Sequence, residues 1–278
     1  MIRLITDTSC LYTPQEGLAN GVTIVPLSVS INKQHYREFV DINSDEFYEL
    51  IKAGHIPTSS QPPIGEVMEI YEQYPNDEIL HLCMADGLSG TYQSALSARD
   101  GMEHKENIHI YNSKTLCGPH RCMIDYLIKM INNGASLTEC KAYLDRVIPT
   151  AISFLIPQDF NFLKRGGRLT PMAATLGGLL KLKPIMTQVN DGQRLEKFDL
   201  ARTLNKAIDL IAAELKKHGV DENWQLSVTH AFVKEQAEKV ASKLKEVFPH
   251  TEIILGELSP AFITQGGPEC IAIQAIQK

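Results

Sequence analysis

The sequence predicts an α/β fold of two domains, with a ligand bound between them. In the first half, strand patterns alternate with helix patterns, which is typical of a mostly parallel sheet with helices on both faces. The second half contains a β-hairpin signal, which indicates a mixed or antiparallel sheet with helices. Polar residues directly follow several strands, and such strand ends form the usual ligand crevice of open α/β sheets. We place the boundary near residue 150, giving domains 1–150 and 151–278, and the C-terminal tail could return to the inter-domain site.

The composition is that of a globular protein. Hydrophobic residues make up 44% of the 278 residues and charged residues 22%, which is enough apolar material for a sizeable core. The net charge is -6 and no dense block of Lys or Arg occurs, so nucleic acid is not expected as a partner. The N-terminus leads directly into a strand without the apolar core of a signal peptide. No apolar run reaches the roughly 18 residues that span a bilayer, and we expect a cytoplasmic location.

Short apolar runs predict the strands of the first half. These strands are Arg3–Thr6, Val22–Ile31 with a break at Pro26, Ile79–Met84 and Ile108–Tyr111. The predicted helices are Ser44–Ala53, Ile64–Tyr74, Tyr92–Asp100, Cys117–Asn133 and Ser136–Val147. Ser44 is the predicted cap of the first helix, and Gly134 ends the fourth.

The second half begins with a β-type run at Ile148–Ile156. The hairpin pairs Ile185–Val189 with Arg194–Phe198 across Asn190-Asp191-Gly192. The remaining predicted elements are the helices Thr203–His218 and Glu235–Val247 and the strands Gln225–Ala231 and Glu252–Glu257. The apolar segment Pro171–Leu182, which contains Gly177-Gly178, fits a core helix, or its small residues leave room for a ligand between the domains.

Two hydroxyl clusters are the sharpest candidates for a binding site. Ser89-Gly90-Thr91 lies between a buried strand and a helix start, where hydroxyls and free backbone N–H groups suit a carboxylate or a phosphate. A second cluster, Thr58-Ser59-Ser60, lies one helix upstream. A carboxylate accepts up to about four hydrogen bonds, so hydroxyls and N–H groups can hold it without a cation. The alternative interpretation is helix N-capping by both clusters, and the two roles are compatible.

Two further motifs each have a structural and a functional interpretation. Asp7-Thr8-Ser9 ends the first strand. These residues could form a turn and helix cap, or they could form a polar wall of the ligand crevice at the strand ends. Lys164-Arg165-Gly166-Gly167-Arg168 is typical of a basic solvated loop, but Arg168 could also bind a phosphoryl group.

Catalytic and metal motifs are weak in this chain. Ser89 lacks a G-x-S-x-G elbow, and His81 within an apolar strand favours a core role. A small hydrolase or transferase that uses the Ser89 and Asp7 cleft remains the alternative function. Cys117-x-x-His120-x-Cys122 lacks standard zinc spacing, so we expect no metal, no cofactor and buried free thiols.

Taken in order, the segments of the whole chain resemble the DegV family. The resemblance is carried by Thr6-Asp7-Thr8-Ser9, Thr58-Ser59-Ser60-Gln61-Pro62, Leu88 to Ala95, Leu163 to Leu169, Lys183-Pro184-Ile185 and Gly267-Pro268. The better-understood members of this family are the fatty-acid-binding subunits of bacterial fatty acid kinase. The resemblance therefore implies two α/β domains that enclose a long-chain fatty acid in a buried tunnel.

The resemblance also implies residue roles and partners. It places the fatty acid carboxylate at Thr58, Ser59, Ser89, Gly90, Thr91 and Gln265. Arg168 and Arg202 become candidates for kinase docking or phosphate contact. By this analogy the chain is not itself an enzyme, and a separate ATP-dependent kinase protein converts the bound acid to an acyl phosphate. A monomer in isolation and transient contact with a membrane surface are also expected.

Two positions depart from the family pattern. Many members carry a His-x-Gly-Pro-Gly run whose His lies by the carboxylate, and here Gln265 occupies that place. Glutamine donates a hydrogen bond but cannot become cationic, so the substitution affects charge compensation of an acyl phosphate. Asn112-Ser113 likewise replaces an Asp-Ser pair.

Overall fold

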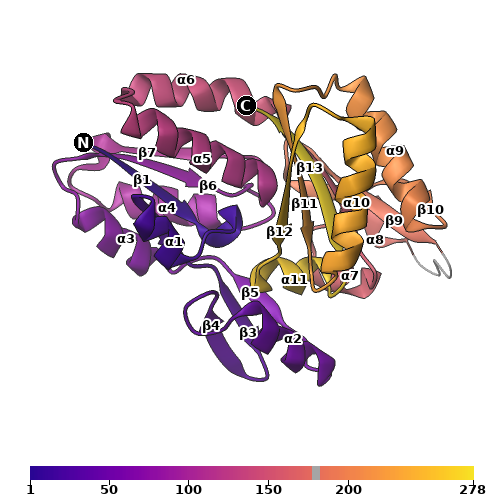
Figure 1. The fold of residues 1–278 in the computed structure, drawn as a ribbon. Helices are drawn as coiled ribbons and strands as arrows, with labels where there is room; N and C mark the ends of the chain where they lie inside the picture. Colours follow the sequence, from indigo (N-terminus) through magenta and orange to yellow (C-terminus); the bar gives the residue numbers. More distant parts are fainter. Residues whose placement is uncertain (177–181) are drawn as a thin grey trace.

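The computed structural model describes residues 1–176 and 182–278 (Figure 1). These residues build three sheets, with strand orders β2-β1-β6-β7, β10-β9-β8-β13-β11-β12 and β4-β3-β5. The predicted α/β fold, with a parallel sheet in the first half and a mixed sheet in the second, is confirmed.

The first sheet is parallel throughout, as the alternation of strands and helices predicts. Its strands are β2 (Val22–Val25), β1 (Ile2–Asp7), β6 (Glu78–Cys83) and β7 (Ile108–Asn112). Helices α5 (Gly118–Asn132) and α6 (Leu137–Val147) cover one face, where they pack on Leu4, Leu80 and Leu82. Helices α3 (Ile64–Glu72) and α4 (Thr91–Asp100) cover the other face, around Ile5 and Ile79. Helix α1 (Pro14–Ala19) connects β1 to β2.

The second sheet is mixed, because only β11 and β12 within it pair in parallel. Its strands are β8 (Ile152–Ile156), β9 (Lys183–Val189), β10 (Arg194–Ala201), β11 (Trp224–His230), β12 (Glu252–Glu257) and β13 (Ile271–Gln277). Helices α9 (Leu204–Lys217) and α10 (Lys234–Val247) bury an apolar core against one face (Figure 1). The C-terminal strand β13 lies inside this sheet, between β8 and β11.

A small antiparallel sheet, which the sequence analysis does not predict, lies beside the larger ones. It consists of β3 (Ser28–Ile31), β4 (Gln34–Arg37) and β5 (Thr58–Ser60) and lies next to α2 (Ser44–Lys52) (Figure 1). The apolar run after Val22 is therefore divided between two sheets, because Pro26 interrupts it. The N-capping interpretation of Thr58–Ser60 is wrong, since these residues pair with β3 and α3 has Pro63 as its N-cap.

Other predicted caps and loops shift by a few residues. Asn43, not Ser44, caps α2 and forms a capping box with Glu46. The basic loop that was predicted before Gly167 is helical, in α7 (Phe160–Gly166), and Gly167 ends it with a positive φ of 71°. The apolar segment after it begins with α8 (Pro171–Ala174), and Gly177-Gly178 lies outside the described residues.

Candidate functional site

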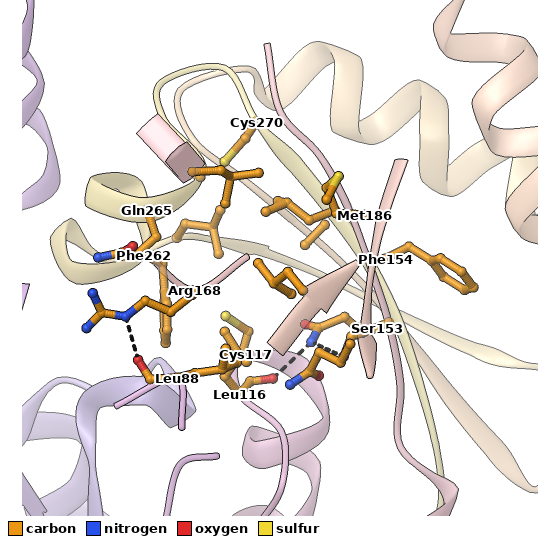
Figure 2. Close-up of a pocket in the computed structure, with 18 of the residues that line it drawn as sticks. Leu88, Leu116, Cys117, Ser153, Phe154, Arg168, Met186, Phe262, Gln265 and Cys270 are labelled. Carbon is orange, nitrogen blue, oxygen red and sulfur yellow. Dashed lines mark hydrogen bonds between the residues drawn. The ribbon is translucent and has the colours of Figure 1, made fainter. Parts of the chain in front are cut away.

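An apolar cavity lies between the first and second sheets. Its free volume is about 100 Å³, and since about 10–15 Å³ suffices for one water, it has room for several groups of that size. Its lining includes Met84, Leu88, Leu116, Cys117, Leu155, Leu163, Met186, Leu195, Leu258, Phe262, Cys270 and Ala272. Figure 2 shows Arg168 and Gln265 together on one side of this cavity, with Met186 and Ser153 across from them.

A smaller polar cavity of about 40 Å³ adjoins the apolar one. Hydroxyl and amide side chains from separate parts of the chain line it, namely Ser59, Ser60, Gln61, Ser89 and Gln265. Both cavities are lined by Met84, Leu88, Arg168, Phe262 and Gln265. The two cavities therefore form one amphipathic site with a polar end and an apolar end.

Helix α11 (Pro260–Gly266) brings Gln265 to the polar end. The Gln265 amide nitrogen Nε2 donates to Ser59 Oγ at 3.1 Å, so two of the six residues that the resemblance places at the carboxylate are in contact. Gln265 Oε1 is buried and has no partner in the described structure. Gly166 makes this arrangement possible, because a Cβ there would lie 2.0 Å from Gln265 Oε1.

The Ser89 cluster lies at the start of α4. Ser89 Oγ is 2.8 Å from Thr91 Oγ1 and accepts from the Thr91 backbone N–H at 3.3 Å. Gly90 is the N-cap residue and has no side chain. A Cβ on this residue would lie only 3.1 Å from the Gln61 side-chain amide, so glycine allows the close approach of Gln61. Thr91 is buried, and of this cluster only Ser89 lines the polar cavity.

Arg168 is the cation that lines both cavities. Its Nε donates to the Leu88 carbonyl oxygen at 3.0 Å and its Nη1 donates to the Gly166 carbonyl oxygen. Burial, and the nearby charge of Arg194, lower the pKa of Arg168. The guanidinium still stays charged at neutral pH, and its remaining N–H donors can serve an anion.

Two predicted site residues lie outside both cavities. Thr58 is exposed on β5 and, as the neighbour of Ser59 in a strand, has its side chain on the opposite face. Arg202 is exposed after the end of β10. It lines neither cavity.

Gln274 belongs to the cavity lining but is not named in the sequence analysis, whereas Asn112 appears there only as a departure from the family pattern. Gln274 on β13 lines the apolar end, where it accepts from Gly118 N–H and donates to Leu116 O and Ser153 Oγ. A lone glutamine in an apolar strand was the available signal. Asn112 Oδ1 accepts from the backbone N–H groups of Asp86 and Lys114, as an aspartate oxygen would.

The Asp7 region is a buried structural corner. Asp7 caps the short helix after β1 by accepting from Ser9 N–H, and its second oxygen accepts from Met84 N–H. His120 bridges the Thr6 and Ser9 hydroxyls through its two ring nitrogens. The turn-and-cap interpretation of Asp7-Thr8-Ser9 therefore holds.

The candidate catalytic and metal-ligating side chains have the following surroundings. Among the described residues, Ser89 is hydrogen-bonded to no His, Asp or Glu side chain. His81 is buried and bonds Tyr71, and burial lowers its pKa to about 4, as befits a core residue. Residues 1–176 and 182–278 contain no group of three His, Cys, Asp or Glu side chains arranged to hold a metal ion. Within the same residues, no helix combines the length and apolar character that crossing a bilayer needs.

A family model described as "Uncharacterised protein, DegV family" matches residues 1–278. The chain belongs to the DegV family. A DegV domain-containing protein of Halalkalibacterium halodurans is 30% identical over 280 residues, covering 98% of this chain and 97% of the relative.

Solved DegV structures have the same fold. "DegV, a fatty acid binding protein from Bacillus subtilis" aligns with a TM-score of 0.86 at 29% identity, covering 100% of this chain and 99% of the other. "Fatty Acid Binding of a DegV family Protein from Thermus thermophilus" describes a second, with a TM-score of 0.87 at 25% identity and the same coverage.

Proposed function

We propose that this DegV chain binds a long-chain fatty acid, with the acyl tail in the apolar cavity and the carboxylate in the polar cavity. The observation that carries the proposal is the shared lining of the two cavities, which joins a polar end to an apolar one. The Bacillus subtilis relative, described as a fatty acid binding protein, supports it.

The energetics require both ends of the site. Burying one CH₂ contributes about 0.8 kcal/mol, so a sixteen-carbon tail gains about 12 kcal/mol relative to water. A bilayer offers the tail nearly the same gain. Selective retention of the acid therefore depends on close packing of the tail and on the contacts of its head group.

The carboxylate is expected to accept hydrogen bonds from Ser59, Ser89 and Arg168. Each of these residues lines the polar cavity. Hydrogen bonds to a charged group each contribute about 1.5–3 kcal/mol, more than bonds between neutral groups. The acid is therefore expected to bind more tightly than an alcohol of equal length.

Replacing Ser59 or Ser89 by alanine is expected to weaken fatty acid binding about tenfold, because each loses a hydroxyl donor to the charged head group. Titration of delipidated protein with a sixteen-carbon acid measures this change. Thr58→Ala is the matched control, since Thr58 is exposed one residue from Ser59 and should keep the parent affinity. Equal affinities in all three variants would contradict the placement of the carboxylate.

We further propose that the bound carboxylate is presented to a separate ATP-dependent kinase, which forms an acyl phosphate. Ser60 and Gln61 line the polar cavity and are themselves exposed, so the head group lies nearer to solvent than the tail. Arg202 is exposed and free to contact a protein partner.

Arg202→Ala is expected to leave fatty acid affinity unchanged and to slow acyl phosphate formation at least tenfold when the kinase and ATP are added. Trapping the acyl phosphate with hydroxylamine measures the rate. Lys206→Ala removes another exposed cation nearby, on α9, and serves as the control. A normal rate in the Arg202 variant would remove this residue from the docking surface, and acyl transfer without any kinase would favour the enzyme alternative.

A further inference from the structure

Glu38 is a fully buried carboxylate at the junction of the small sheet with α11. Its exposed fraction is 0%. Glu38 Oε1 accepts from the Thr8 hydroxyl, and Oε2 accepts from the Ala261 backbone N–H at 2.8 Å. No part of the fatty acid site described above includes it, because Glu38 lines neither cavity.

The contact with Ala261 replaces an ordinary helix cap. Ser259 is the N-cap residue of α11 but its side chain makes no capping hydrogen bond. Glu38 accepts instead from the Ala261 N–H, which is the first N–H of the helix because Pro260 has none, across a separation of 223 residues. A negative charge is favourable at a helix N-terminus, so the ionised carboxylate holds α11 in place.

The contact with Thr8 extends to the other side of the polar cavity. Thr8 Oγ1 accepts from Leu27 N–H at 2.9 Å while it donates to Glu38, and Glu38 N–H donates to the Leu27 carbonyl oxygen at 2.9 Å. Leu27 lines the polar cavity and leads into β3, which pairs with β5 and so positions Ser59.

Glu38 thus connects helix α11 with the small sheet, and these two elements meet at the hydrogen bond between Gln265 and Ser59. One element carries Gln265 and the other supports Ser59, and these side chains are hydrogen-bonded to each other. We propose that Glu38 is a positioning residue for the carboxylate site, and that loss of its negative charge loosens the site and weakens fatty acid binding. This inference rests on the proposed function.

The surroundings of Glu38 make its charge sensitive to pH. Burial raises the pKa of Glu38 to about 7, against the lowering effect of its hydrogen bonds with Thr8 and Ala261. The titratable groups that face it are Asp7 at the end of β1, which raises the pKa further, and the Cys117 thiol before α5. Ser259, the N-cap residue that precedes α11, is a further polar neighbour.

The ionised form has opposite effects on folding and on binding. The pKa of Glu38 is raised in the folded state, so protonation of Glu38 stabilises the folded chain. This stabilisation is fully present at pH values below the ordinary pKa range of a carboxyl group, and it is lost as the pH rises to about 7. Removing the charge should therefore leave the melting temperature equal or higher. Binding should instead weaken, because only the ionised form holds both α11 and Thr8.

The test compares the parent chain with Glu38→Gln at pH 8 and at pH 6, by titration with a sixteen-carbon acid. The parent should bind about tenfold more tightly than Glu38→Gln at pH 8, and the two should converge at pH 6, since apparent affinity scales with the competent fraction. Titration of the ligand's own carboxyl is common to both proteins and cancels in their ratio. Glu257→Gln is the control for loss of an acidic charge, because the pKa of Glu257 is also raised, by partial desolvation, but this more exposed residue lines neither cavity.

A constant affinity ratio at both pH values would overturn the proposal, and so would a Glu38→Gln variant that melts below the parent. Thr8→Val provides a second variant, which removes the hydroxyl link to Leu27 and should lower the affinity at pH 8 to a similar degree. A parent chain that binds no fatty acid at either pH would instead refute the proposed function.

Discussion

Replacing Ala272 by leucine is expected to reduce the affinity for a sixteen-carbon acid about 50-fold. Ala272 lies on β13, lines the apolar cavity and does not line the polar one. The three added carbons displace about three methylenes of the tail, which costs about 2.4 kcal/mol at about 0.8 kcal/mol each. A titration series of acids of increasing chain length measures the effect.

The chain-length series also supplies the control for this variant. An acid of eight carbons should bind Ala272→Leu and the parent equally, because a short tail does not need the displaced volume. The unliganded variant should be at least as stable as the parent, since the new side chain fills empty space. Equal affinity for the sixteen-carbon acid in both proteins would place the tail elsewhere.

Arg168→Gln is expected to weaken binding of the fatty acid about 10- to 100-fold, the effect of losing a charged hydrogen-bond donor worth about 1.5–3 kcal/mol. Arg168 is the cation that lines both cavities, at the boundary between head group and tail. The alcohol of the same chain length carries no charge, so its affinity should change little. The ratio of acid to alcohol affinity therefore isolates the contribution of the guanidinium.

Arg194→Gln is the matched control for this second variant. Arg194 lies close enough to lower the pKa of Arg168 but lines neither cavity. It should retain the preference of the parent for the acid over the alcohol. An unchanged preference in Arg168→Gln would show that the carboxylate is held without this cation.

The sequence was sufficient to predict the other strands of the two larger sheets, because these have clear apolar patterns. It did not predict β13, whose residues Ile271–Ile276 are all buried and show no alternation. The small sheet was missed because β5 is a short polar strand, Thr58–Ser60, and only its pairing with β3 defines it. Helix α11 was missed because it is almost entirely buried, whereas β5 is short and polar. Its residues Pro260–Thr264 are all buried, so no polar face marks a helical period.

The residues of the candidate site that belong to recognisable sequence motifs could be predicted. Ser89 and Gln265 were expected near a carboxylate, and the structure places both at the polar cavity, although their role stays a prediction. Glu38 could not be predicted, because it follows an exposed strand and its partners lie 30 and 223 residues away. Side-chain direction could not be predicted for Thr58 either, since it depends on the register of β5.

The identity of a lipid that accompanies the purified chain tests the central claim most directly. The protein is denatured and extracted with organic solvent, and the extract is analysed for fatty acids by mass spectrometry. We expect a long-chain acid in a ratio near one per chain from the parent protein and much less from Ala272→Leu. An extract without fatty acid, from protein that also takes up none when it is added, would contradict it.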